Sequence, residues 1–136
     1  MICDDDYETA ERLASALRGA GHDAEVCRHT MDMLRGAAAG RFDLIALGLD
    51  MAGFGRAGAV DALAEVAPRI PVVALHTRPF DVIHAAPHRR FAAVLPRPVE
   101  TKNFMYAVAC ALSERDERAS APRRKSSGPI LKRSVG

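Results

Sequence analysis

The 136-residue sequence has no tryptophan, and aromatic residues make up only 5% of it. No apolar run approaches the roughly 20 residues that a membrane-spanning helix requires. The first dozen residues also lack the basic and apolar regions of a secretory signal. The pattern G-x-x-x-x-G-K-[ST] does not occur, which excludes the usual phosphate-binding loop for nucleoside triphosphates. We therefore expect a cytoplasmic protein with no membrane insertion.

The three cysteines, Cys3, Cys27 and Cys110, are odd in number and widely spaced, so they predict neither a disulfide framework nor a zinc site. We expect them to be reduced, with Cys27 and Cys110 on buried faces. His84 and His88 have the spacing of a metal-binding pair, but a proline lies between them and no acidic third ligand is near. No metal site is predicted there.

The net charge of +2 hides a strong asymmetry along the chain. Residues 118–136 carry six basic residues and no acidic residue, whereas residues 1–117 carry 13 basic and 17 acidic residues. An acidic body, 1–117, is therefore followed by a basic tail, 118–136. The tail is rich in Ser, Pro and Gly and has no amphipathic period, so we expect it to be disordered when free.

The body alternates short apolar runs with stretches of helical periodicity. Strands are predicted at 1–3, 24–27, 43–49, 71–76 and 91–95, and helices at 7–20, about 30–39, 57–67 and 100–117. Two prolines limit any helix within 78–90 to about two turns. This alternation predicts an α/β fold with a doubly wound, five-stranded parallel sheet and helices on both faces.

The helical periodicity also predicts which side chains face the core. Thr30 is expected to cap the second helix and Gly40 to end it. The predicted inward residues are Ala10, Leu13, Ala14 and Leu17 in the first helix, Met31, Leu34 and Ala38 in the second, Val60, Leu63, Ala64 and Ala67 in the third, and Phe104, Val108, Ala111 and Leu112 in the last.

Polar residues follow the predicted strands in a recognisable order. Asp4 and Asp5 follow the first strand, the third strand lies in DLIALGLDMAG (43–53), and Arg97-Pro98 follows the fifth. This order resembles the receiver domain of two-component signalling, also called CheY-like or flavodoxin-like. The resemblance implies an Asp that accepts a phosphoryl group after the third strand, an acid pair that holds Mg²⁺, a Ser or Thr after the fourth strand, and a Lys-Pro after the fifth.

Several of these positions are changed. Asp4 and Asp5 match the acid pair, but the phosphoacceptor position is Gly48, the Ser/Thr position is His76 and the Lys position is Arg97. Glycine cannot form an acyl phosphate, and a Mg²⁺ site would lack one protein ligand. We expect a vestigial pocket with no catalytic residue and no bound metal or cofactor, in which Arg97 pairs with the acids. Asp50 stays open as a substitute nucleophile or a surface carboxylate.

The composition of the tail predicts that it binds a compact anionic ligand. Arginine can bind guanine through O6 and N7 and stack on bases, while Ser hydroxyls and Gly amides can contact phosphate. A degenerate receiver with an arginine-rich tail is similar to the CheY-like cyclic di-GMP effectors of flagellated alphaproteobacteria. The resemblance implies cyclic di-GMP as ligand, with the flagellar motor as partner and roles in motility, chemotaxis and surface attachment. The candidate ligand residues are Asp116, Arg118, Arg123, Arg124, Lys125, Ser126, Ser127, Gly128, Ile130, Leu131 and Arg133.

The leading hypothesis is thus a non-enzymatic effector that binds cyclic di-GMP. The first alternative is a phosphorylation-independent adaptor in which the body docks a protein partner and the tail supplies only charge. Non-specific association of the tail with nucleic acid or an anionic membrane is a third hypothesis, although the tail has no interleaved aromatics and no amphipathic helix. A conventional phosphorylated receiver is the least favoured, because Gly48 removes the nucleophile. No specific nucleic acid is predicted as a partner.

Overall fold

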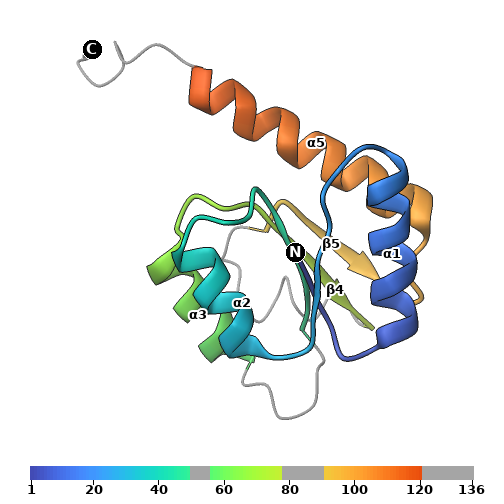
Figure 1. The fold of residues 1–136 in the computed structure, drawn as a ribbon, viewed down its shortest axis with the longest axis horizontal. Helices are drawn as coiled ribbons and strands as arrows, with labels where there is room; N and C mark the ends of the chain where they lie inside the picture. The colour runs from blue at the N-terminus through green and yellow to red at the C-terminus, as the bar shows by residue number, and fades with distance from the viewer. Residues whose placement is uncertain (50–55, 78–90, 121–136) are drawn as a thin grey trace.

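The computed structural model describes residues 1–49, 56–77 and 91–120, with the backbone alone at 56–58 and 118–120. Five parallel strands form one sheet in the order β2-β1-β3-β4-β5 (Figure 1). The strands are β1 (Ile2–Cys3), β2 (Val26–Cys27), β3 (Ile45–Gly48), β4 (Val72–His76) and β5 (Ala93–Pro96). The helices in the described residues are α1 (Tyr7–Gly19), α2 (Thr30–Ala38), α3 (Arg56–Val66) and α5 (Thr101–Ser120). The prediction for 78–90 lies outside the described residues.

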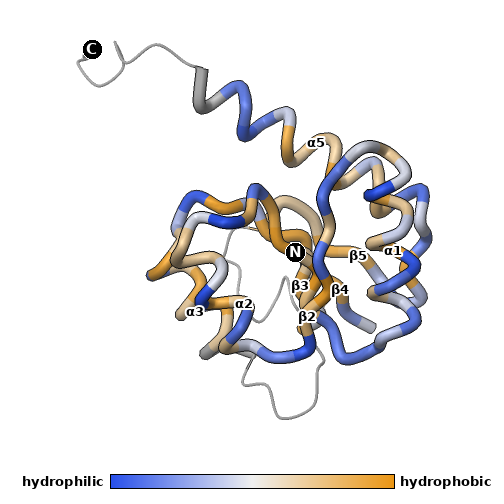
Figure 2. Tube along the Cα trace, in the orientation of Figure 1, coloured by the Kyte–Doolittle hydropathy of each residue, from blue (hydrophilic) through white to orange (hydrophobic). Residues whose placement is uncertain are grey.

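Helices cover both faces of the sheet, as predicted. Successive side chains of a strand point to opposite faces, so Ala46 and Val73 pack with α1 and α5, whereas Ile45 and Leu47 pack with α2 and α3. Figure 2 shows the apolar strands lying between these two helical layers. This double coverage explains why the sequences of β3 and β4 are almost continuously apolar.

The first helix forms where its sequence predicts. Asp6 is the N-cap, and its carboxylate accepts hydrogen bonds from the Thr9 amide at 3.3 Å and the Thr9 hydroxyl at 2.8 Å. The four predicted inward residues of α1 are all buried. Gly21, with φ of 93°, follows the end of the helix in a conformation that glycine adopts without strain.

The prediction for α2 is wrong about its N-cap and about two of its three inward residues. His29 is the N-cap residue and makes no side-chain capping bond, so Thr30 is already the first residue of the helix. Met31 is 58% exposed, and Ala38 is exposed as well. Leu34 is half-buried.

The buried side of α2 consists of Met33, Gly36 and Ala37. A Cβ atom at Gly36 would lie 2.3 Å from Cε2 of Phe42, so this helix packs against the Phe42 ring through a residue without a side chain. The periodicity favoured the stripe that contains Met31 and Leu34. Close packing instead buries the stripe that contains Gly36 and Ala37, whose small size lets the helix approach its neighbours.

Smaller corrections apply to the other helices. In α3, Leu63 is buried and Val60 half-buried as predicted, but Ala64 is exposed. In α5, the predicted inward residues are buried or half-buried, and the helix ends at Ser120, three residues after its predicted end. The last turns of α5 extend beyond the sheet and are hydrophilic (Figure 2).

The cysteines are free. Cys3 and Cys27 are buried and lie opposite each other in the β1–β2 pair, but Cys110 is only half-buried, which corrects its predicted burial. Desolvation raises the pKa of the Cys3 thiol to about 12, and the neighbouring Cys27 adds to this rise. Cys3 is therefore in the unreactive thiol form near neutral pH. No helix within the described ranges is long and apolar enough to cross a membrane.

Candidate functional site

The candidate site lies where the strands of the sheet end. Asp4 directly follows β1, Gly48 is the last residue of β3, and Arg97 directly follows β5. Because the strands are parallel, their carboxyl ends lie at the same edge of the sheet, which is where ligands bind in open α/β folds. The fold thus brings together three residues that are separated by up to 93 positions in the sequence.

Arg97 pairs with Asp4. Its Nη2 atom donates a hydrogen bond to Oδ1 of Asp4 at 3.0 Å and lies 3.0 Å from Oδ2 as well. The Asp4 side chain is completely buried, and that of Arg97 is 17% exposed. Among the described residues, Oδ2 has no hydrogen-bond partner, so the ion pair uses one guanidinium nitrogen instead of the two-nitrogen fork that a bidentate pair would use.

Gly48 makes this ion pair possible. A Cβ atom at position 48 would lie 2.7 Å from Nη2 of Arg97 and 2.7 Å from Oδ1 of Asp4. These distances are shorter than any ordinary contact with a carbon atom. The Arg97–Asp4 ion pair therefore occupies the space that a side chain at the end of β3 would fill.

Burial controls the protonation of Asp4. Desolvation raises the pKa of this carboxyl above its ordinary value, while Arg97 and the Asp6 amide, 3.3 Å from Oδ1, oppose the rise. The positive charge of Arg97 compensates in part for a buried carboxylate that would otherwise be strongly unfavourable. The pair is the electrostatic centre of the pocket.

Two other predicted residues lie at the same edge. His76 ends β4 and is buried, and its carbonyl oxygen accepts a hydrogen bond from the Arg97 amide at 3.1 Å. Asp5 is exposed beside Asp4, and its charge contributes to the raised pKa of Asp4. All five residues of the predicted pocket, Asp4, Asp5, Gly48, His76 and Arg97, thus lie at the end of a strand or within two residues after it.

The donor set does not suit Mg²⁺. This ion requires about six oxygen ligands in octahedral geometry. Gly48 offers no carboxylate, and a guanidinium nitrogen lies within 3.0 Å of both oxygens of Asp4. A cation bound to Asp4 would meet the positive charge of Arg97 at contact distance, so we derive no chemistry through a metal here.

The predicted ligand residues are described only in part. Asp116 is exposed on α5, and Arg118 lies in the last turn of the same helix. Asp50, His84 and His88 lie outside the described residues, as do the tail residues Arg123, Arg124, Lys125, Ser126, Ser127, Gly128, Ile130, Leu131 and Arg133.

Sequence reasoning missed a groove of about 650 Å³ along the outer edge of β2. We call it the β2 groove. It lies between α1 and α2, and the charged and aromatic residues that line it include Tyr7, Glu11, Arg18, Arg28, Asp32 and Arg41. These residues come from four separate segments. The i, i+4 spacing of Tyr7 and Glu11, which places both on one helix face, is the only signal that the sequence offered.

Comparisons with known proteins agree with this architecture. No protein-family model matches the sequence. The chain is 25% identical over 123 residues to the DNA-binding transcriptional regulator NtrC of Bradyrhizobium sp. (strain RP501 Parasponia), covering 90% of this chain and 26% of that protein. It is 30% identical over 107 residues to a response regulator receiver protein of Anaeromyxobacter sp. (strain Fw109-5), covering 77% of this chain and 44% of that protein. The chain therefore spans less than half the length of either relative.

A solved structure gives the same result for the fold. The CheY-like response regulator receiver domain protein of Methanospirillum hungatei JF-1 superposes with a TM-score of 0.78 at 14% identity, over 86% of this chain and 94% of that one. At this identity, the similarity concerns the fold alone. Together with the strand order and the pocket at the carboxyl edge of the sheet, it shows that this chain has the fold of the response regulator receiver domains.

Proposed function

We propose that this chain is a non-enzymatic signalling module of the receiver type that works without phosphorylation and binds cyclic di-GMP through its basic tail. The similarity to receiver proteins supports the signalling role. The finer assignment depends on two features of this chain, namely the Gly48 pocket and the distribution of charge.

The occupied pocket is the observation that carries the proposal. A phosphorylated receiver needs a carboxylate nucleophile and charge neutralisation around the transferred phosphoryl group. Position 48 has no side chain, and Arg97 is already paired with Asp4 in the space above it. A signal has to enter this molecule by another route.

The tail supplies that route. Its six basic residues follow an acidic body with a net charge of −4. Guanine offers O6 and N7 to arginine, and two phosphates offer further charge-assisted contacts. Fixing each tail residue costs roughly 1–2 kcal/mol of conformational entropy, so a ligand with two bases and two phosphates suits the tail better than a single phosphate.

In this proposal, cyclic di-GMP orders the tail against the end of α5, where Asp116 is exposed and offers a carboxylate to a guanine. The ordered tail and α5 then form a surface for a protein partner. The proposed partner is the flagellar motor switch.

Calorimetric titration of cyclic di-GMP into the full chain tests the proposal, with GTP and a short oligonucleotide as competing anions at two salt concentrations. The double variant Arg123→Ala/Arg124→Ala removes two tail arginines. Arg69→Ala is the matched control, because Arg69 is exposed on the turn between α3 and β4. We expect saturable binding by the wild type and the control, and at least tenfold weaker binding by the double variant.

Two results would contradict the proposal. Absence of binding by the full chain would exclude cyclic di-GMP as ligand. Equal heat from every anion, collapsing with added salt, would show a tail that provides only charge. That second result would favour an adaptor whose body docks a protein partner.

A further inference from the structure

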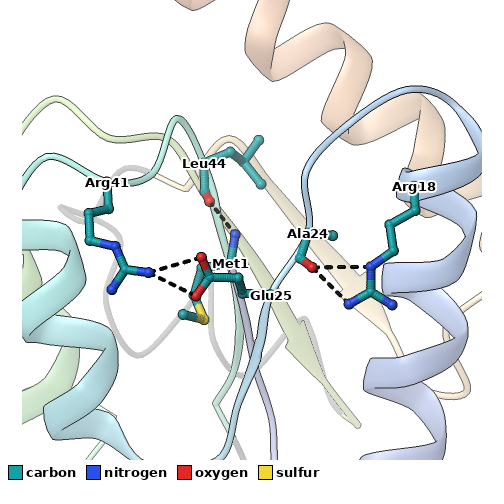
Figure 3. Close-up of polar contacts among 6 residues, drawn as sticks. All are labelled: Met1, Arg18, Ala24, Glu25, Arg41 and Leu44. Atoms are coloured by element: carbon teal, nitrogen blue, oxygen red, sulfur yellow. Dashed lines mark hydrogen bonds and ion pairs between the residues drawn. The ribbon is translucent and has the colours of Figure 1, made fainter.

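The β2 groove has the size of a small-molecule site. Its volume of about 650 Å³ lies within the range of roughly 300–1,000 Å³ that ligand pockets occupy. Its lining includes residues of α1 and α2, the helices that Figure 1 shows on either side of the strands. Figure 3 shows part of its rim, where Arg18 on α1 binds the Ala24 carbonyl oxygen and Arg41 on the opposite side binds Glu25.

The β2 strand contributes backbone groups to this groove. The Ile2 amide donates to the Glu25 carbonyl and the Asp4 amide to the Cys27 carbonyl, so these two carbonyl groups face β1. Alternate residues of a parallel strand direct their backbone groups to opposite sides. The N–H and C=O groups of Val26 therefore face the outer edge, and Val26 lines the groove.

The side chains of the groove combine both charges with an aromatic face. The Arg28 guanidinium lies 4.6 Å from the centre of the Tyr7 ring. Within the described part of the chain, Arg28 makes no hydrogen bond or ion pair, so its donors are available to a ligand. The Glu11 carboxylate lies 3.7 Å from Arg18, an ion-pair distance beyond that of a good hydrogen bond.

This combination selects among ligand classes. The three arginines repel a metal cation, whereas the three carboxylates repel a bare phosphate. An apolar molecule would desolvate all of these charges without pairing them. A purine nucleotide can use both kinds of group, because its base stacks on a guanidinium or aromatic plane and its phosphate pairs with arginine.

Guanine fits better than adenine. The N1–H and N2–H groups of guanine are adjacent donors that one carboxylate can accept, and O6 and N7 are acceptors for arginine. The corresponding edge of adenine has an acceptor at N1, which a carboxylate does not tolerate. Glu11 supplies the acceptor, and Arg28, whose guanidinium lies against the Tyr7 ring of the same helix, supplies a cationic plane in the groove.

We propose that the β2 groove binds the guanine base of a guanine nucleotide, with Glu11 accepting hydrogen bonds from N1–H and N2–H and with Arg28, supported by Tyr7, stacking on the base. For cyclic di-GMP as the natural ligand, this inference rests on the proposed function. In that case the groove binds a guanine base of the ligand, and the basic tail contacts its phosphates.

The end of α5 is anchored to the segment that enters β3. Nη1 of Arg115 lies 3.0 Å from Oδ1 of Asp43. The next residue, Leu44, has a carbonyl oxygen that accepts a hydrogen bond from the amino group of Met1, which lines the groove (Figure 3). The helix that leads into the tail is thus connected to one end of the groove.

The test titrates GMP and AMP into the full chain. Arg28→Ala removes the stacking cation, and Glu11→Gln replaces the acceptor by a side chain of the same size. Both residues lie at the surface or near it, and Arg69→Ala is again the control. We expect the wild type and the control to bind GMP at least tenfold more tightly than AMP, and each groove variant to weaken GMP binding at least tenfold. The amides of Val26 and Cys27 should shift in NMR spectra on adding GMP.

The outcomes separate this inference from the proposed function. If GMP fails to bind, or binds both groove variants like the wild type, the inference is overturned whatever the tail does. If the groove variants bind GMP more weakly while the full chain does not bind cyclic di-GMP, the groove site is supported and the proposed function is contradicted. If cyclic di-GMP binding depends on Arg123 and Arg124 but not on Arg28 or Glu11, the proposed function stands alone.

Discussion

At the scale of single residues, Gly48 decides what the buried Asp4 can pair with. The first prediction concerns Gly48→Ala. Its new methyl group would lie 2.7 Å from both Arg97 Nη2 and Asp4 Oδ1. Either the guanidinium moves away, leaving a buried carboxylate without its cation, or the strand shifts. We expect a loss of about 1–3 kcal/mol in the free energy of unfolding, measured by urea denaturation.

Gly19→Ala is the matched control for this substitution. Gly19 ends α1, and no atom of the described segments lies within 4 Å of a Cβ atom at this position. Alanine there reduces the entropy of the unfolded chain and should stabilise the protein by about 0.4–1 kcal/mol. Equal effects of the two substitutions would contradict the crowding of the Gly48 position.

The second prediction concerns Asp4 and pH. Burial raises the pKa of this carboxyl in the native state above its ordinary value of 3.8. The native state then holds the proton more tightly than the unfolded state, so the Asp4 contribution to stability is greatest below pH 3.8 and declines as pH rises through the raised pKa. Relative to Asp4→Asn, which cannot titrate, the wild type should lose stability over this interval.

Asp6→Asn provides the comparison of opposite sign. Hydrogen bonds from Thr9 lower the pKa of the exposed Asp6 carboxyl. Its contribution is present above the ordinary value and disappears as pH falls through the lowered pKa. Urea denaturation across acidic pH should give opposite slopes for the two differences. Parallel slopes would show that burial does not dominate at Asp4.

At the scale of elements, α2 shows how packing chooses between two apolar stripes. The third prediction is that Met33→Ala costs about 2–5 kcal/mol of stability, because Met33 is fully buried under the β3 face. Met31→Ala removes a side chain that is 58% exposed and should change stability by less than about 0.5 kcal/mol. Thermal and urea denaturation measure both. A larger loss of stability for Met31→Ala than for Met33→Ala would show that the Met31 side of α2 is the buried one, as the periodicity predicts.

At the scale of the whole molecule, the sheet places a cation where a receiver would be phosphorylated. The fourth prediction is that acetyl phosphate with Mg²⁺ adds no phosphoryl group to the full chain, as measured by intact mass spectrometry. Beryllofluoride with Mg²⁺ should leave the melting temperature unchanged, because a ligand stabilises a protein only when it binds the native state and we expect neither ion to bind this pocket. The reason is the Arg97–Asp4 pair above Gly48.

A gain of one phosphoryl group would contradict this prediction. Peptide mapping would then locate the modified residue. Asp50, two residues after Gly48, is the first position to inspect.

Much of the fold follows from the sequence alone. The apolar runs at 43–49 and 71–76 predict buried strands, and the alternation of strands and helices predicts a doubly wound parallel sheet. The periodicity of α1 predicts its buried face correctly, because it has a single strong apolar stripe. The sequence also determined the charge asymmetry and the identity of Gly48, since neither depends on packing.

Tertiary structure decided what local patterns leave ambiguous. The buried stripe of α2 depends on the close approach of Gly36 to Phe42, which no local period records. The resemblance to receiver domains predicts the pairing of Asp4 with Arg97, but the single-nitrogen geometry and the place of the ion pair above Gly48 are set by the folded structure. The β2 groove is assembled from distant segments, so only the folded chain shows it. Sequence determines what each segment can bury, and packing determines which of the possible contacts are made.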